Sequence, residues 1–317
     1  MIRLVSPKNN STVRLLTDAQ RAFIENGGSY TAEDISIPEP VVFTCEPAVS
    51  GELTLISRGG DERKYSLERG RAEVYNLLAN GEYRWYVTAG FMRSETHTFK
   101  TEADVPRFLY VGGLSNVRDI GGFEGLGGRR VRQGMVFRAT EPQGVTNLTK
   151  EGRETLRDEL KIRTDLDFRG INGEEVRESL GDIGANFVNI PLAAYADIFT
   201  EEQMRAYKSS FELLAKREFY PIIAHCQCGM DRTGTWLYIL GALLGVDEGE
   251  LALDYELSSL SRWGERSRGS EDFKAFLEKF HAYGASARVA AENFLAACGV
   301  SDEVVELIRS NLIEDSL

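Results

Sequence analysis

The spacing of apolar residues changes once along this chain, near residue 101, and no other feature constrains the fold as strongly. From about Val13 to Thr101, short segments alternate apolar and polar residues, which is the period of strands with one buried face. Beyond residue 101, helical spacing alternates with short apolar runs, which is typical of a mainly parallel sheet. The polar stretch Thr101–Pro106 separates the two patterns. We therefore expect an all-β sandwich over residues 1–105, and over residues 106–317 an α/β domain with a central, mainly parallel sheet flanked by helices.

The same patterns give the expected positions of individual elements. Strands are expected in the first part at Val41–Cys45, Gly51–Ser57, Glu73–Leu78, Tyr83–Thr88 and Thr96–Thr101. Strands are expected in the second part at Ile162–Phe168, Asn186–Ile190 and Tyr220–Ala224. Helices are expected at Asn147–Leu160, from Thr200 to Leu214, and at Thr233–Leu244, Glu248–Leu260, Glu271–Ala282, Ala287–Ala297 and Asp302–Asn311.

Charge and composition exclude several classes of protein. The chain has 37 Lys and Arg against 49 Asp and Glu, a net charge of -12, which argues against nucleic acid and anionic membrane surfaces as partners. The longest apolar run, Trp236–Val246, is too short to insert into a membrane, and the N-terminus has no export signal pattern. The 4 cysteines are too few for a disulfide framework in a chain of 317 residues. We expect a cytoplasmic protein in a reducing compartment.

One segment combines the residues of a phosphate site with those of a nucleophile. His225-Cys226-Gln227-Cys228-Gly229-Met230-Asp231-Arg232-Thr233-Gly234 lies between an expected strand and an expected helix. A tight loop in this place points backbone N–H groups inward at the positive end of the helix, which suits a phosphate dianion. The loop residues expected to contact substrate are Gln227, Cys228, Gly229, Met230 and Thr233.

The same electric field stabilises a negatively charged sulfur, so Cys226 is expected to ionise easily and act as a nucleophile. Arg232, six positions later, offers a planar pair of donors to two phosphate oxygens. Thr233 can donate a hydrogen bond to the sulfur when it leaves. Asp231 is placed to protonate the departing oxygen.

These residues resemble the signature loop of the protein tyrosine phosphatase superfamily, in which Cys-x5-Arg is the core. Asn116-Val117-Arg118-Asp119-Ile120-Gly121-Gly122 resembles a motif near the start of the bacterial tyrosine/serine phosphatase family, and Asp167-Phe168-Arg169 followed by Glu174 and Glu175 resembles another family landmark. The resemblance runs from about Arg107 to about Leu260. It implies phosphomonoester hydrolysis on protein phosphotyrosine, or with dual specificity, through a phospho-cysteine. The resemblance implies no cofactor or metal. It adds Arg118 and Asp119 to the residues expected to bind substrate. The alternative role for both residues is to form a hydrogen-bonded turn that fixes the start of the domain.

Two departures from the family leave questions open. Met230 stands where many relatives have a lysine that helps lipid-directed members to bind additional phosphates, so phosphoinositide activity is disfavoured. There is no Trp-Pro-Asp sequence before the loop, which leaves Asp231 as the candidate general acid and Asp197 as its competitor.

The same residues could serve functions other than that of a protein phosphatase. An inositol phosphate or phosphoinositide phosphatase is disfavoured because the second domain is acidic. A non-catalytic module that binds phosphorylated partners is disfavoured because both Cys226 and Arg232 are present. His225, Cys226 and Cys228 could serve as zinc ligands, but a fourth ligand is hard to find. The expected partner is therefore a phosphorylated protein or a small phosphomonoester.

The first hundred residues have a resemblance of their own. Asn80-Gly81 is a turn dipeptide, and Tyr83, Trp85 and Val87 follow it on one face of a strand. This spacing and the segment His97–Thr101 resemble the tyrosine corner and last strand of fibronectin type III domains.

Overall fold

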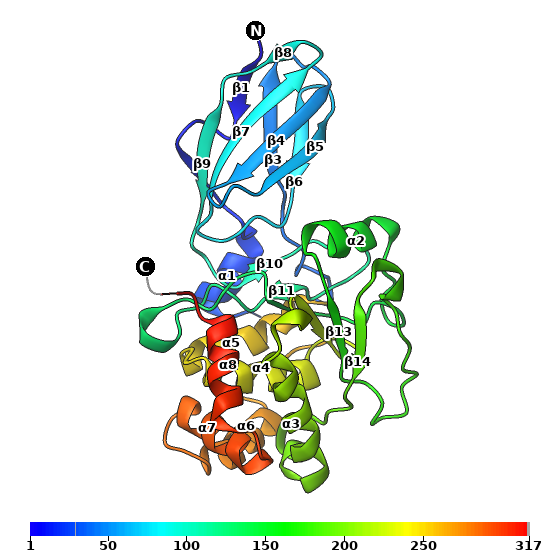
Figure 1. The fold of residues 1–317 in the computed structure, drawn as a ribbon, viewed down its shortest axis with the longest axis vertical. Coiled ribbons are helices and arrows are strands. Elements are labelled where there is room, and N and C mark those ends of the chain that lie inside the picture. The colour runs from blue at the N-terminus through cyan, green and yellow to red at the C-terminus, as the bar shows by residue number, and fades with distance from the viewer. Residues whose placement is uncertain (29, 316–317) are drawn as a thin grey trace. The chain divides into compact units, whose positions relative to one another are not determined.

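The structure is a computed structural model that describes residues 1–28 and 30–315. The chain divides into two compact units (Figure 1). Unit 1 comprises Met1–Arg21 and Pro38–Leu109, and unit 2 comprises Ala22–Ile37 and Tyr110–Leu317.

Unit 1 consists mainly of strands arranged in two sheets. One sheet has the order β1-β3-β6, and the other has the order β2-β9-β7-β4-β5, with β8 paired to β7. The strands are β1 (Arg3–Ser6), β2 (Ser11–Val13), β3 (Val41–Glu46), β4 (Gly51–Ser57), β5 (Glu62–Leu67), β6 (Arg71–Val74), β7 (Glu82–Ala89), β8 (Met92–Arg93) and β9 (His97–Thr101), and β10 (Arg107–Phe108) ends the unit.

The alternating residues of these strands form one hydrophobic core. Trp85 on β7, Phe43 on β3 and Phe99 on β9 are fully buried, and Phe43 meets both other rings edge-on at 4.9 and 5.6 Å. The Tyr83 hydroxyl accepts a hydrogen bond from the Leu78 N–H at 2.8 Å, which fixes the turn before β7. The predicted strands at Val41–Cys45 and Gly51–Ser57 are confirmed, whereas β5 was not predicted.

Unit 2 is built on a sheet with the strand order β11-β12-β15-β13-β14. β12, β15, β13 and β14 are parallel to one another, and β11 runs antiparallel to β12. The strands are β11 (Arg118–Asp119), β12 (Val136–Ala139), β13 (Thr164–Asp167), β14 (Asn186–Asn189) and β15 (Ile222–His225). The expected mainly parallel sheet flanked by helices is present.

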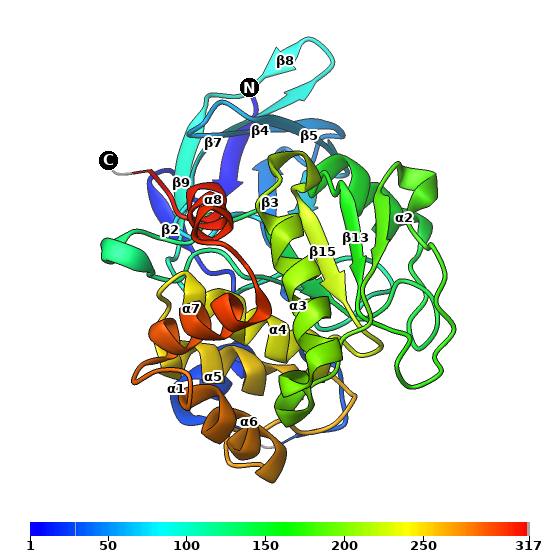
Figure 2. The ribbon, with the colours of Figure 1, turned by 60° about the horizontal axis from the view of Figure 1, so that its bottom comes forward.

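Helices flank this sheet and continue to the end of the unit. α4 directly follows β15 and packs against α5 and α7, and α7 also packs against α3 (Figure 2). Almost every residue of α4 is buried, as expected for a helix packed on several sides. The helices are α2 (Lys150–Glu154), α3 (Glu201–Leu214), α4 (Asp231–Leu243), α5 (Glu248–Glu256), α6 (Glu271–His281), α7 (Ala287–Cys298) and α8 (Asp302–Leu312).

Two local features differ from the expected pattern. α1 (Asp18–Asn26) was not predicted. The helix expected at Asn147–Leu160 starts at Lys150 after its N-cap Thr149 and changes to a π-helical turn at Thr155–Glu159.

Candidate active site

The segment singled out by sequence forms a tight loop between β15 and α4. Cys226 follows the last residue of β15, and Arg232 and Thr233 lie in the first turn of α4. Gly229 has φ +64°, and a Cβ atom there would lie 2.1 Å from the carbonyl oxygen of Ala139. Only glycine fits this position, because both the backbone angle and the space exclude a side chain.

All five carbonyl oxygens from Cys226 to Met230 accept hydrogen bonds, and that of Met230 also accepts the first helical bond of α4, from the Gly234 N–H at 2.8 Å. A peptide group points its C=O and N–H in opposite directions, so carbonyls held outward turn the next N–H groups inward. The donors are the His225 ring to Cys226 O (3.0 Å), Glu141 N–H to Gln227 O (3.0 Å), Asn116 Nδ2 to Cys228 O (3.3 Å) and Gly229 O (3.1 Å), and Arg138 Nη2 to Gly229 O (2.6 Å) and Met230 O (3.4 Å).

A buried charge network supports two of these donors. Arg118 donates to the Asn116 side chain, and Arg118 and Arg138 both pair with Asp254 on α5. Both guanidinium groups also lie within hydrogen-bond distance of Ser258 Oγ, at 3.3 and 3.1 Å. The network holds Asn116 and Arg138 against the outer side of the loop.

Arg118 and Asp119, which were predicted to bind substrate, are both fully buried, and Arg118 contacts Asp254 and Asn116. Asp119 accepts hydrogen bonds from the N–H groups of Gly121 (2.8 Å) and Gly134 (2.6 Å). The alternative interpretation, a hydrogen-bonded turn that fixes the start of the domain, matches the contacts of Asp119.

Cys226 has the surroundings of a reactive thiol. The residue is 3% exposed, and burial alone raises the pKa of its thiol. The positive charge of Arg232 and the nearby hydroxyl and N–H of Thr233 outweigh burial, so the pKa of Cys226 lies below its ordinary value. Cys228 differs, because burial raises the pKa of its thiol to about 11.

Arg232 pairs with a carboxylate. Its Nη1 forms an ion pair with Glu174 Oε1, and both side chains are 11% exposed. The other carboxylate oxygen of Glu174 accepts hydrogen bonds from the N–H groups of Gly170 (3.1 Å) and Asn172 (2.9 Å). Glu174 is therefore fixed by its own loop at the place where it meets the guanidinium.

Asp231 lies in a polar cluster at the start of α4. Arg266 forms a two-point ion pair with it, and the hydroxyl of Tyr195 donates a hydrogen bond to it. Tyr195 also meets the hydroxyl of Tyr255 at 2.7 Å. Burial raises the pKa of the Asp231 carboxyl, but Arg266 and Tyr195 outweigh burial and hold it below its ordinary value.

The remaining predicted residues differ in exposure. Gln227 is exposed and Cys228 is half-buried, whereas the Met230 side chain is fully buried. Asp197, the competing acid candidate, is exposed on a short helical turn, Tyr195–Phe199.

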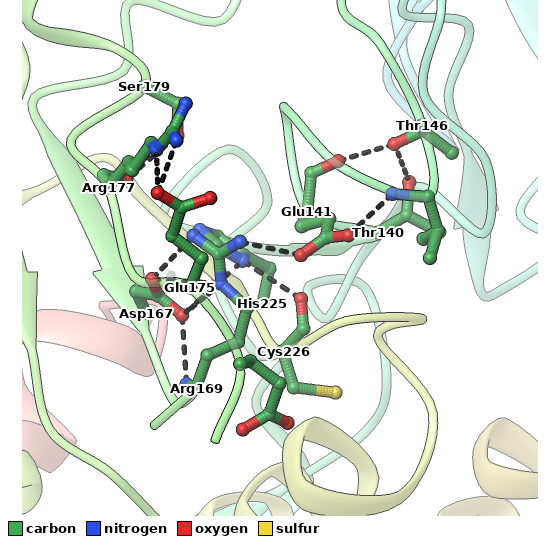
Figure 3. Close-up of polar contacts among 12 residues, drawn as sticks. Thr140, Glu141, Thr146, Asp167, Arg169, Glu175, Arg177, Ser179, His225 and Cys226 are labelled. Carbon is green, nitrogen blue, oxygen red and sulfur yellow. Dashed lines mark hydrogen bonds and ion pairs between the residues drawn. The ribbon is translucent and has the colours of Figure 1, made fainter. Parts of the chain in front are cut away.

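A cavity of about 480 Å³ lies beside the loop in unit 2. Its charged lining groups are three carboxylates and two guanidinium groups, and the loop contributes Gln227. The charged residues are Glu141, Glu174, Glu175, Arg169 and Arg177. Figure 3 shows several of them with their mutual ion pairs.

A comparison with known protein families shows which family the chain belongs to. Residues 109–314 match the sequence profile of the tyrosine phosphatase family. The chain belongs to this family. A curated protein of Cupriavidus necator, named as a candidate tyrosine-protein phosphatase, is 28% identical over 166 residues, which cover 45% of this chain and 59% of that protein. This chain thus matches little more than half the length of the relative.

Two solved structures of Siw14, a PP-IP phosphatase from S. cerevisiae, are also similar to this member of the tyrosine phosphatase family. The core catalytic domain in complex with citrate is 16% identical, with a TM-score of 0.32, over 41% of this chain and 75% of that one. The Siw14 catalytic core is 16% identical, with a TM-score of 0.31, over 39% and 70%.

Several residues of the site carry no recognisable signal in the sequence. Arg138, Asp254 and Arg266 lie far from the loop in sequence, and no local motif marks them. Glu174 belongs to a segment that resembles a family landmark, but the resemblance did not indicate its contact with Arg232.

Within residues 1–28 and 30–315, no group of three or more His, Cys, Asp or Glu side chains could hold a metal ion. Over the same residues, no helix is both long and apolar enough to cross a membrane.

Proposed function

We propose that the protein is a cysteine-dependent phosphatase that hydrolyses phosphomonoesters, chiefly phosphotyrosine in proteins, through a phospho-cysteine at Cys226. The observation that carries the proposal is the pairing of a buried, acidified thiol with a loop whose carbonyls are all held outward. Such a loop presents several N–H groups to one anion, and Arg232 adds a positive charge beside them.

The reaction proceeds in two steps. The Cys226 thiolate attacks phosphorus, and the electron pair of the broken P–O bond passes to the leaving oxygen, which takes a proton from Asp231. Water then attacks phosphorus and gives its proton to Asp231, and the electron pair of the P–S bond returns to sulfur. The Thr233 hydroxyl is close enough to the sulfur to donate a hydrogen bond to it as the leaving group in the second step.

The surroundings of Asp231 favour its role as a base more directly than its role as an acid. Its ion pair with Arg266 keeps the carboxylate ionised in this structure, which suits the acceptance of a proton from water. In the first step the carboxyl must be protonated. A bound phosphate dianion favours protonation, because a nearby like charge raises the pKa of a carboxyl group.

The lining of the cavity beside the loop favours a phosphoprotein over a polyphosphate as the substrate. Its two guanidinium groups already pair with carboxylates, Arg177 with Glu175 and Arg169 with Glu141. A second phosphate would therefore meet carboxylates without an unpaired cation among these residues, which costs affinity.

The role of unit 1 and the compartment belong to the same proposal. The two sheets around one core and the Tyr83 turn support a fibronectin-III-like packing or interaction module, with the domain boundary near residue 105. A thiolate nucleophile works only while it stays reduced, which supports the cytoplasm as the working compartment.

Replacement of the nucleophile tests the proposal. Cys226→Ser should abolish hydrolysis of p-nitrophenyl phosphate and phosphotyrosine peptides while vanadate still binds, because the loop and Arg232 remain. Cys45→Ser, a buried cysteine of unit 1, is the matched control and should keep its activity. A panel of phosphotyrosine peptides, phosphoserine peptides and inositol polyphosphates then ranks the substrates. Turnover by Cys226→Ser near the wild-type rate would refute the covalent mechanism, and a higher kcat/KM for an inositol polyphosphate would refute the substrate class.

A further inference from the structure

A buried group of charged side chains lies behind the phosphate-binding loop, and none of its members takes part directly in the proposed reaction. His225 ends β15, and its ring is fully buried. Asp165 and Asp167 lie on the neighbouring strand β13, both fully buried, and Asp167 is the register partner of His225. Figure 3 shows the contact from the His225 ring to the Cys226 carbonyl.

Both ring nitrogens of His225 face acceptors. Nε2 lies 2.8 Å from Asp165 Oδ1, and Nδ1 lies 3.0 Å from the Cys226 carbonyl oxygen. A carboxylate and a carbonyl can only accept hydrogen bonds, so both contacts are satisfied only when each nitrogen carries a proton. The proton shared with Asp165 belongs on the ring, because imidazole is the stronger base by roughly two to three pKa units.

The other charges around the ring favour the same protonation state. Asp167 Oδ1 lies 3.8 Å from Nδ1, and Asp167 also binds Arg169, which in turn pairs with Glu141. Two carboxylates thus face the imidazole, one of which shares a guanidinium with Glu141, and a positive ring reduces this excess of negative charge. Burial alone would lower the pKa of His225, but Asp165 and Asp167 outweigh it and raise the pKa to about 9.

We propose that Asp165 is a positioning residue: it holds His225 as an imidazolium, which fixes the Cys226 carbonyl and places a positive charge behind the nucleophile. The first peptide group of the loop is thereby oriented so that the following N–H points inward. The consequence for catalysis rests on the proposed function. The protonation state of the ring does not, and it can be measured without substrate.

Asp165→Asn is the informative variant because it separates charge from shape. The asparagine amide can donate to Nε2 while the neutral ring still donates from Nδ1 to the Cys226 carbonyl. The packing is preserved, and the ion pair is lost as a whole: the imidazolium charge disappears together with the Asp165 carboxylate, which contacts the ring nitrogen that faces away from the Cys226 carbonyl. A merely structural role for Asp165 predicts little change in the ionisation of Cys226.

The first measurement is the protonation of the ring by nitrogen NMR of protein labelled with ¹⁵N-histidine. The chain has 3 histidines, so His97→Asn and His281→Asn assign the other two signals. In the wild-type protein at pH 7.5, both His225 nitrogens should be protonated, and in Asp165→Asn only one should be. A neutral His225 in the wild-type protein overturns the proposal, and this result does not require the variant to fold.

The second measurement is the pH dependence of Cys226 alkylation by iodoacetamide, followed by mass spectrometry. Asp165→Asn should raise the midpoint by half a pH unit or more, which is about a threefold slower reaction below the midpoint. Asp158→Asn, a surface aspartate paired with Arg157, is the matched control and should leave the midpoint unchanged. An unchanged midpoint in Asp165→Asn also overturns the proposal.

Phosphatase activity separates the two proposals. A protonated ring with the expected alkylation shift but no phosphatase activity would remove the proposed function and keep the role of Asp165 in thiol ionisation. An active enzyme with a neutral His225 would keep the proposed function and remove the role of Asp165.

Discussion

Asp231 shows how far the role of one residue depends on contacts that sequence spacing does not reveal. Its position beside Arg232 makes it a candidate acid, and the place of Cys226 and Arg232 in a loop between a strand and a helix could be predicted because it depends on local spacing. The contacts of Asp231 with Arg266 and Tyr195 could not be predicted, because those residues lie 35 and 36 positions away. These contacts determine whether its carboxyl is ionised.

A series of leaving groups tests the acid role of Asp231. A poor leaving group must be protonated as it departs, so Asp231→Asn should slow phosphotyrosine hydrolysis about a hundredfold or more and activated aryl esters far less. The measurement is kcat/KM for substituted phenyl phosphates of increasing leaving-group pKa. Asp197→Asn, at the exposed aspartate that is the competing candidate, should give a flat series. A flat series for Asp231→Asn together with a slope for Asp197→Asn would move the acid role to Asp197.

At the scale of elements, the loop is shaped by its neighbours as much as by its own residues. The strand before it and the helix after it could be predicted from apolar spacing. The motif at Asn116 was recognised only as a resemblance, because its hydrogen bonds join residues 112 and 113 positions apart. Local sequence propensity does not indicate a contact between residues so far apart, so the role of Asn116 behind the loop could be identified only from the fold.

Asn116→Asp tests whether the loop needs its carbonyls held from outside. The carboxylate would face two carbonyl oxygens instead of donating to them, and such an unmet buried contact costs about 1–3 kcal/mol. The affinity for inorganic phosphate, measured by protection of Cys226 from alkylation, should fall about tenfold. Asn311→Asp is a matched control, because Asn311 also donates to two carbonyls, those of Leu214 and Ala215. If both variants lose stability but neither loses phosphate affinity, Asn116 only stabilises the fold.

The contacts of His225 on β15 with Asp165 and Asp167 on β13 predict that the free energy of unfolding depends on pH. The pKa of His225 is raised to about 9 in the folded protein, above its ordinary value of 6.5. Its contribution is therefore complete below about pH 6.5 and is lost as the pH rises through about 9. The free energy of unfolding in urea should fall over this range by roughly 3 kcal/mol from this group. His225→Gln should remove that part of the slope, and an identical slope in both proteins would contradict the raised pKa.

At the scale of the whole chain, the change in apolar spacing near residue 101 indicated where strands give way to helices and parallel strands. The expected boundary at residue 105 stays a prediction. Sequence did not indicate that residues 22–37, which lie between two parts of unit 1, group with unit 2. The Ile35 N–H donates to the carbonyl of Leu260 at 2.8 Å, and the Tyr30 hydroxyl donates to the carbonyl of Arg262. Contacts across more than 220 positions leave no periodic signal.

Ser36 in this segment is connected to the phosphate-binding loop through hydrogen bonds of Asn116. It is 1% exposed, its hydroxyl oxygen accepts from the Asn116 N–H at 3.0 Å, and its hydroxyl donates to Asp34 at 2.6 Å. Ser36→Ala leaves a buried N–H without its acceptor, at a cost of about 1–3 kcal/mol. Because the Asn116 side chain holds two loop carbonyls, part of this cost should appear as weaker phosphate binding.

We therefore expect Ser36→Ala in the full chain to lower both the melting temperature and the affinity for inorganic phosphate, the latter by roughly threefold to tenfold, since about 1.4 kcal/mol corresponds to a factor of ten. Ser210→Ala provides the comparison. Ser210 is equally buried in unit 2 and accepts from Trp236 Nε1 at 3.0 Å, so its loss should lower the melting temperature alone. Equal losses of stability with unchanged phosphate affinity in both variants would show that residues 22–37 support the fold of unit 2 but not its loop. A selective loss of phosphate affinity in Ser36→Ala would make this segment a working part of the site, because its hydrogen bond to Asn116 is then needed to keep the loop carbonyls turned outward.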